Sequence, residues 1–358
     1  MKPIFFLFSL FLVFSCAEKE PKTTEAPQPK KPKNIILLIG DGTGLSQVSS
    51  AQFFKDSPSN YDRFPVIGLI KTSSASDLVT DSAAGATAFA SGVKTYNGAV
   101  GVDKDSSSVK TLVEIASEKG MTTGLIATSS ITHATPACFF AHSKSRDNHE
   151  EIASFLSKSD IDFFAGAGLK YFNKRKDSLN LLNEFQKNGF EIDTLSLSEK
   201  NAKKVGFLLA DKSMPKMIEG RGNFLIEATM LATQKLSEDS SGFFLMVEGS
   251  QIDWGGHEND AAYLISELID FDNTLGAVLD FAKQNGETLV IVTADHETGG
   301  FSLSANGEDY NQIISTFSTH GHTATMVPVF AYGPGASNFG GIYDNTEIFH
   351  KIVALVSE

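Results

Sequence analysis

A series of short apolar runs, separated by longer amphipathic stretches, constrains the fold more than any other feature of this chain. The runs have the length of buried strands and cover residues 35–39, 66–70, 123–127, 243–247, 289–292 and 327–332. Helices are predicted between them, most clearly over residues 109–119, 223–236 and 263–283. This alternation predicts an α/β fold with a mostly parallel central β-sheet and helices on both faces. Residues 165–240 are expected to form intervening helices and loops, with one weak strand at 207–209.

The N-terminus has the pattern of an exported protein. Residues 1–15 contain an early lysine and a continuous apolar run, as in a secretory signal peptide. The run ends at a Ser-Cys junction of the bacterial lipoprotein type, so we expect Cys16 to be acylated; ordinary cleavage near Ala17 is the alternative. Residues 16–33 predict a disordered tether, and residues 34–358 a single domain. The expected location is the periplasm or outer membrane of a Gram-negative bacterium.

Composition excludes some partners. The formal net charge of −13 argues against nucleic acid as a binding partner, because such proteins rely on a broad basic face. Of the two cysteines, Cys138 lies within an apolar run, where a small buried hydrophobe is expected rather than a reactive thiol.

Acidic residues and histidines gather just after several of the expected strands. They are Asp41, His133, Glu248, Asp253, His257, Asp295, His296 and Glu297. Because ligands of open α/β sheets bind outside the carboxyl ends of the strands, this placement favours a metal site over scattered surface charge. Carboxylates with neutral imidazoles suit zinc, and a set of oxygens suits magnesium. Each of these short motifs is weak evidence by itself. Their shared position after the strand ends is what favours a metal site.

A candidate nucleophile lies in the segment 79–87. Ser82 is followed by a run of small residues that can begin a helix packed close to the sheet, where its hydroxyl would face a bound anion. From these residues alone, an Ala-rich core helix capped by Asp81 or Ser82 explains the segment equally well.

Together these segments resemble the alkaline phosphatase family. The similarity runs in order from about residue 34 to the C-terminus, and the serine segment is its most specific part. Its other parts are Asp41-Gly42, residues 247–257, residues 293–296, and His322-Thr323 ahead of residues 333–335. The resemblance implies the family's α/β sandwich and hydrolysis of small phosphate monoesters, with transfer of the phosphoryl group to Ser82 and then to water.

The resemblance also implies two zinc ions and one magnesium ion. The first zinc would take Asp253, His257 and His322. The second would take Asp41, Asp295 and His296, with Ser82 joining during turnover. Magnesium would take Asp41, Glu248 and Thr135. Arg146 matches the arginine that binds phosphate oxygens, and a guanidinium can bind two of them at once. A homodimer is expected on the same grounds.

Two positions depart from many bacterial members of the family. His133 stands where they have aspartate, and Trp254 where they have lysine, a pairing nearer to animal-type enzymes. Both are expected near the substrate phosphate, and whether His133 binds the third ion directly stays open. The segment 319–322 offers two histidines, of which His322 is preferred over His320 because threonine follows it.

Two other functions compete with this interpretation. A related two-metal phosphodiesterase or sulfatase on the same fold would lack the serine segment and a third-site ligand such as Glu248. An envelope lipoprotein that only binds phosphate would need neither Ser82 nor a full set of metal ligands. The sequence does not indicate the natural substrate.

Overall fold

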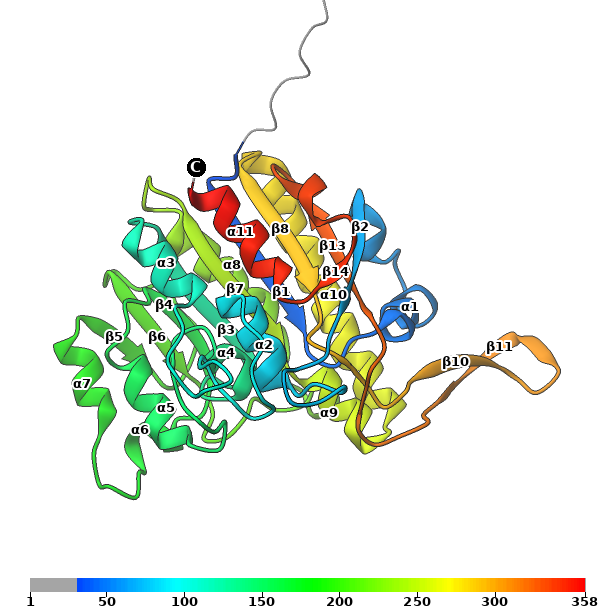
Figure 1. Ribbon diagram of the computed structural model, residues 1–358, viewed down its shortest axis with the longest axis horizontal. Coiled ribbons are helices and arrows are strands. Elements are labelled where there is room, and N and C mark those ends of the chain that lie inside the picture. Colours follow the sequence, from blue (N-terminus) through cyan, green and yellow to red (C-terminus); the bar gives the residue numbers. More distant parts are fainter. Residues whose placement is uncertain (1–30, 358) are drawn as a thin grey trace, which may run out of the picture.

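The computed structural model describes residues 31–357, so the predictions for residues 1–30 lie outside it. A ten-stranded sheet runs through the centre, in the order β14-β2-β13-β8-β1-β7-β3-β4-β6-β5 (Figure 1). The strands from β8 to β5 are parallel, and β13 runs antiparallel to both of its neighbours. The prediction of a mostly parallel sheet is confirmed.

The central sheet is built from β1 (Asn34–Gly40), β2 (Val66–Lys71), β3 (Thr122–Ser130), β4 (Phe163–Ala167), β5 (Phe190–Asp193), β6 (Lys204–Leu208), β7 (Phe243–Gly249), β8 (Thr288–Thr293), β13 (Val327–Tyr332) and β14 (Gly341–Asp344). Two small antiparallel ladders lie outside it: β9 (Glu297–Thr298) with β12 (His322–Thr323), and β10 (Ser302–Asn306) with β11 (Asp309–Thr316). The second ladder is a hairpin that projects from the body (Figure 1).

Helices cover both faces of the sheet, as predicted. One face packs against α2 (Ser82–Ser91), α3 (Leu112–Glu118), α4 (Ala134–Ala137), α5 (His149–Leu156), α7 (Leu181–Lys187) and α11 (Glu347–Ser357). The other packs against α1 (Leu45–Phe54), η1 (Asn60–Arg63), α8 (Phe224–Leu236), α9 (Gln251–Glu258) and α10 (Ala261–Asn285). Short helices α6 (Lys170–Asn173), η2 (Met217–Glu219) and η3 (Ala336–Phe339) complete the chain. Between residues 31 and 357, no helix is long and apolar enough to cross a bilayer.

The prediction for residues 165–240 was wrong in part. This region and its edge contribute β4, β5 and β6, rather than one weak strand. β4 was missed because its Ala-Gly-Ala end has low strand propensity, and its pairing with β3 and β6 decides its conformation. β5 is a short edge strand. The helix expected from residue 109 begins at 112, because the Thr111 hydroxyl caps it and Glu114 accepts from the Thr111 N–H.

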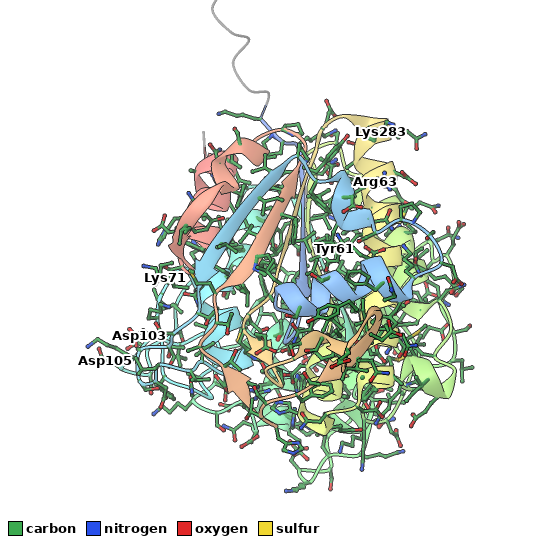
Figure 2. The ribbon with its side chains drawn as sticks, turned by 90° about the vertical axis from the view of Figure 1, so that its right-hand side faces the viewer. Tyr61, Arg63, Lys71, Asp103, Asp105 and Lys283 are labelled. Carbon is green, nitrogen blue, oxygen red and sulfur yellow. The ribbon has the colours of Figure 1, made fainter. Side chains whose placement is uncertain are left out.

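Long α10 anchors two connections that would otherwise be exposed loops. The 3-10 turn η1 lies beside it, where Arg63 contacts Asp280 at 2.5 Å (Figure 2). The segment 211–222 is held by Arg221, whose fully buried guanidinium bonds Glu267 and Asp270 of α10. This second connection bears on the site described below, because the Met214 carbonyl accepts a bond from Gln251 at the start of α9.

Replacing Arg221 should destabilise the fold strongly. Arg221→Met leaves two buried carboxylates without their cation, and breaking such a group costs about 3–5 kcal/mol. Lys235→Met is the control: its partner Glu238 is largely exposed, so the loss should stay below about 1 kcal/mol. Chemical unfolding of both variants measures the difference, and similar unfolding free energies would contradict the prediction.

Candidate metal centre and active site

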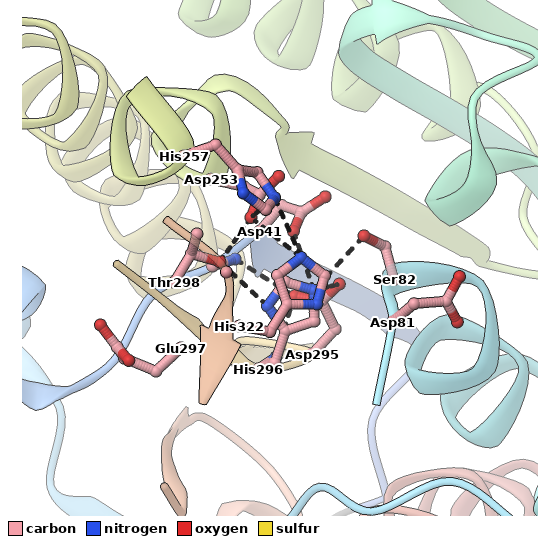
Figure 3. Close-up of polar contacts among 12 residues, drawn as sticks. Asp41, Asp81, Ser82, Asp253, His257, Asp295, His296, Glu297, Thr298 and His322 are labelled. Carbon is pink, nitrogen blue, oxygen red and sulfur yellow. Dashed lines mark hydrogen bonds and ion pairs between the residues drawn. The ribbon is translucent and has the colours of Figure 1, made fainter. Parts of the chain in front are cut away.

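Among residues 31–357, three clusters of possible metal ligands lie at the carboxyl edge of the parallel strands. The first joins Asp253 and His257, one turn apart on α9, with His322 of β12 (Figure 3). Asp253 Oδ1 lies 3.4 Å from His257 Nε2 and 3.6 Å from His322 Nε2. The i, i+4 spacing seen in the sequence therefore places both α9 side chains on one side of the helix, facing His322.

Backbone carbonyls orient both histidines of this first cluster. His257 Nδ1 lies 2.5 Å from the His320 carbonyl oxygen, and His322 Nδ1 lies 2.9 Å from the Thr80 carbonyl oxygen. Because a carbonyl oxygen can only accept, each Nδ1 donates a proton, and Nε2 is the ring nitrogen that faces inward. These two Nε2 atoms are 3.1 Å apart, and a carboxylate faces them. Such converging atoms fit a cation with nitrogen and oxygen ligands.

The second cluster consists of Asp41, directly after β1, and Asp295 and His296, directly after β8. His296 Nε2 lies 3.6 Å from Asp41 Oδ1 and 3.3 Å from Asp295 Oδ2. On the other side of the ring, Nδ1 faces the Thr298 hydroxyl at 3.2 Å. That hydroxyl in turn donates to Asp253, so one threonine links the first and second clusters.

The third cluster combines Asp41 with Glu248 of β7 and His133 at the start of α4. The Thr135 hydroxyl is buried in the same helix and has no hydrogen-bond partner. Ser250 donates to one oxygen of Glu248 at 2.6 Å, while the other oxygen is unpartnered. The set is rich in oxygen, but the single histidine adds a nitrogen, which magnesium accepts less readily than zinc.

The electrostatics of the clusters fit cations. Both oxygens of Asp41, one of Glu248 and one of Asp295 are buried without a hydrogen-bond partner. Burial, followed by the charges of Asp295, Asp253 and Glu248, raises the pKa of Asp41 well above its usual value. Burial likewise raises the pKa of Asp295, and that of Glu248 to about 7. A group of buried carboxylates with raised pKa values is stabilised in its ionised form by bound cations.

Ser82 lies beside the second cluster as the first residue of α2, and its Oγ is 3.3 Å from His296 Nε2. The cap of this helix is Asp81, which accepts from the Ala84 N–H at 2.9 Å. The capping role that the sequence left open therefore belongs to Asp81, and the Ser82 hydroxyl is free of it. A Cβ on Gly85 would lie 2.9 Å from Asp295 Cβ, which shows why small residues follow the serine.

Arg146 points toward the same place. Its Nη1 donates to Asp81 Oδ2 at 2.9 Å, and that oxygen also accepts from the Gly98 N–H. The side chain is about one quarter exposed. Burial lowers the pKa of Arg146, but the charges of Asp81, Asp41 and Asp253 outweigh burial and raise it above its usual value. An arginine held at one nitrogen can offer its other N–H groups to an anion beside the clusters.

The remaining predicted residues surround this centre. Trp254 of α9 meets His133 edge to face, with ring centroids 5.7 Å apart. His320 lies outside the clusters, where its Nδ1 bonds the His257 carbonyl. His142 bonds the Gly101 carbonyl and Glu114, and His149 bonds Thr132 and stacks on Tyr171. Cys138 is fully buried, and burial raises the pKa of its thiol to about 12, which fits an unreactive core residue.

Sequence reasoning missed the residues that support the ligands. Asp81 was considered only as a cap, and its pairing with Arg146 spans 65 positions. Thr298 had a local signal, since it follows His296 by two residues and residues two apart share a face of an extended strand. Glu297 stood among the acidic residues after the expected strand at 289–292 but received no role, and Gln47, which bonds it behind the clusters, had no local signal.

Comparison with known proteins decides the family. The chain matches the model of the family described as alkaline phosphatase over residues 32–316 and 304–357. It belongs to the alkaline phosphatase family. Alkaline phosphatase 3 of Bacillus subtilis is 38% identical over 89% of this chain and 88% of its own length. The alkaline phosphatase of Escherichia coli is 32% identical over 91% of this chain and 86% of its own.

A solved structure agrees in fold. The alkaline phosphatase from the Antarctic bacterium TAB5 superposes with a TM-score of 0.91 at 58% identity, covering 92% of this chain and 99% of that one. This alkaline phosphatase is therefore a metal-binding phosphomonoester hydrolase. The family assignment favours a phosphomonoesterase over the diesterase, sulfatase and non-enzymatic alternatives.

Proposed function

We propose that this alkaline phosphatase hydrolyses phosphate monoesters in two steps, through a covalent phosphoserine at Ser82. The observation that carries the proposal is the place of the Ser82 hydroxyl, 3.3 Å from His296 Nε2, at the start of a helix and beside the second cluster. The N-terminus of α2 directs its first N–H groups and its positive dipole end toward an anion bound there. A phosphate at this point would meet the nucleophile and Arg146 together.

In the first step, Ser82 Oγ forms a bond to phosphorus while the ester oxygen leaves, and the serine proton ends on the released alcohol. In the second, water attacks phosphorus, the Oγ–P bond breaks, and Ser82 regains a proton from that water. Arg146 holds phosphate oxygens through both steps, and Asp81 keeps its guanidinium in position. Trp254 and His133 are also proposed to contact the substrate.

The proposed metal content is two zinc ions and one magnesium ion. Zinc would bind Asp253, His257 and His322 in the first cluster, and Asp41, Asp295, His296 and, during turnover, Ser82 in the second; magnesium would bind Asp41, Glu248 and Thr135. These cations would lower the pKa of the serine hydroxyl and neutralise the leaving oxygen. The unpartnered carboxylate oxygens and the inward Nε2 atoms support this content.

Removing the nucleophile should separate chemistry from metal binding. Ser82→Ala should lower turnover of a phosphomonoester by several orders of magnitude, because only direct attack by water on the bound ester is left. Zinc content should equal that of the wild type. Steady-state kinetics with metal analysis checks both expectations, and acid quenching should trap phosphate on wild-type Ser82 only. A variant with a near wild-type rate would rule out Ser82 as nucleophile.

The third cluster supports a further part of the proposal. Structures of the TAB5 enzyme in which a histidine is replaced by aspartate or by glutamate are described as having magnesium bound in the M3 site. We propose that His133 is the counterpart here, because it is the histidine of the third cluster. Burial lowers the pKa of His133 to about 3, so the ring is neutral at the third site. A neutral nitrogen should hold magnesium weakly.

Exchanging that histidine for an oxygen ligand should tighten magnesium binding. His133→Asp should retain more magnesium after gel filtration than the wild type, and should need less added magnesium to reach its own maximal rate. His149→Asp is the control, since His149 lies outside the clusters. Equal magnesium retention in all three proteins would show that His133 does not govern the third site.

We also propose that the enzyme is exported and anchored by acylation of Cys16, in the periplasm or outer membrane of a Gram-negative bacterium. The support is the sequence pattern of residues 1–15, which resembles a signal peptide. These residues and Cys16 lie outside the part of the chain that the structure describes. The mature protein should begin with a lipid-modified Cys16 and fractionate with membranes. Mass spectrometry of the mature N-terminus decides this, and an unmodified start at Ala17 or beyond would refute it.

We propose in addition that the enzyme is a homodimer. The hairpin of β10 and β11 leaves the body of the molecule and exposes apolar side chains, with Tyr310 85% and Ile314 39% exposed (Figure 1). Such surface on a projecting arm suits a second copy of the chain. Sedimentation of the wild type should give twice the mass of one chain, and removal of the hairpin tip around Tyr310 should lower it. A monomeric wild type would contradict the proposal.

A further inference from the structure

Glu297 is a buried carboxylate with no role in the mechanism above. It follows His296 directly but points away from the ligand clusters, while its neighbour Thr298 points into them (Figure 3). The two side chains alternate because β9 is an extended strand. Glu297 is only 5% exposed. Burying a carboxylate is costly unless its hydrogen bonds are satisfied, so its partners matter.

All of its hydrogen-bond donors are neutral, and they come from different segments. Oε1 accepts from Gln47 Nε2 at 2.7 Å and from the Phe301 N–H at 3.0 Å. Oε2 accepts from the Thr323 hydroxyl at 2.6 Å. Thr323 lies opposite Glu297 in the two-residue ladder between β9 and β12. The carboxylate therefore joins its own segment to α1, 250 positions away, and to β12, 26 positions away.

Two of these segments carry proposed metal ligands. Thr323 directly follows His322, so its bond to Glu297 holds the strand that brings His322 to the first cluster. Gln47 lies on α1 and accepts from the Gly44 N–H at 3.0 Å, and thereby fixes the loop that follows Asp41. The amide of Gln47 also donates to the Thr298 carbonyl.

Close packing leaves the loop after Asp41 little room to move against Glu297 and the first cluster. A Cβ on Gly44 would lie 2.6 Å from Glu297 Cγ. Gly42 has a φ of +73°, and a Cβ there would lie 2.7 Å from Asp253 Cα and 2.8 Å from Thr298 Oγ1. The loop after Asp41 thus lies against Glu297 on one side and against the first cluster on the other.

We propose that Glu297 is a positioning residue that sets the first and second clusters relative to each other, through Thr323 toward His322 and through Gln47 toward Asp41. The inference rests on the proposed function, because it assumes that the clusters bind zinc. Losing a residue that orients a metal ligand lowers metal affinity about 10- to 100-fold. Small displacements of the reacting groups also cost rate, since transfer depends on near-attack geometry.

The test measures zinc affinity by titrating metal-free protein in competition with a chromophoric chelator. Thr323→Val removes the link between Glu297 and the His322 strand, together with a bond to Thr325, and should weaken one of two zinc ions about 10- to 100-fold. Gln47→Met removes the link to the Asp41 loop, together with the bond to the Thr298 carbonyl, and should weaken the other. Glu297→Met should weaken both. Thr325→Val is the control, because it removes the hydroxyl that bonds Thr323 and leaves the bond between Thr323 and Glu297 in place.

Repeating the substitutions in a second protein shows which cluster each of them affects. In a His257→Ala protein, which lacks a ligand of the first cluster, Thr323→Val should have no further effect on the zinc ion that is left. Gln47→Met should still weaken it. The thermal midpoint of the metal-free Thr323→Val protein should fall, because one oxygen of the buried Glu297 carboxylate loses its hydrogen bond. An equal loss of affinity at both zinc sites, rather than at one, would indicate general destabilisation and overturn the positioning role.

The outcomes separate this inference from the function on which it rests. A wild type that binds two zinc ions, with unchanged affinities in the Thr323 and Glu297 variants, overturns the role of Glu297 and leaves the metal sites intact. A wild type that binds no zinc overturns both. If Glu297→Met fails to fold, the milder Thr323→Val variant still decides the question.

Discussion

Repulsion among buried carboxylates is the constraint on which the architecture of the site depends. Asp41, Glu248, Asp253 and Asp295 are all at least 96% buried within one small region. Two like charges 4 Å apart repel by about 4 kcal/mol at an effective dielectric constant of 20, so this group cannot ionise together without nearby cations. The raised pKa values of Asp41, Glu248 and Asp295 express the same conflict. Metal binding and the folding of this edge of the sheet are therefore coupled.

The parallel sheet creates this concentration of charge. Strands β8, β1, β7 and β3 are neighbours that end at one edge, and β1 pairs with both β7 and β8 over most of its length. Residues just past these ends are brought together without any long loop. Small residues then allow the connecting backbone to approach closely: Gly42 packs on Asp253, and Gly85 on Asp295. Rigid elements, rather than flexible loops, carry most of the proposed ligands.

The histidines show how ordinary hydrogen bonds prepare a metal site. In His257 and His322, a backbone carbonyl holds Nδ1, and in His296 the Thr298 hydroxyl does so. Each ring therefore presents Nε2 to the centre. Two of these three supports come from distant segments of the chain. The ladder of β9 and β12, only two residues on each strand, matters more than its size suggests, because it carries His322, Thr298 and Glu297.

The sequence by itself determined the elements and the kinds of chemistry available. Buried strands such as β1 and β7 are recognisable because both faces are covered and their residues are continuously apolar. The ligand types after these strands, and the small residues after Ser82, are local patterns that indicate metal binding and a nucleophile. The short edge strand β5 and the Ala-Gly-Ala end of β4 were not predictable in this way, because neighbouring strands decide their conformation.

Only the tertiary structure decided what holds the candidates in place. The resemblance had implied which ligands belong together, and the structure places them in three clusters; it also gave the capping role to Asp81 and paired that residue with Arg146. It also joined Gln47 to Glu297 across 250 positions of sequence. The physical reason is that periodicity and spacing report the direction of a side chain along its own element. The distance between side chains on different elements is set by packing, and no local pattern encodes it.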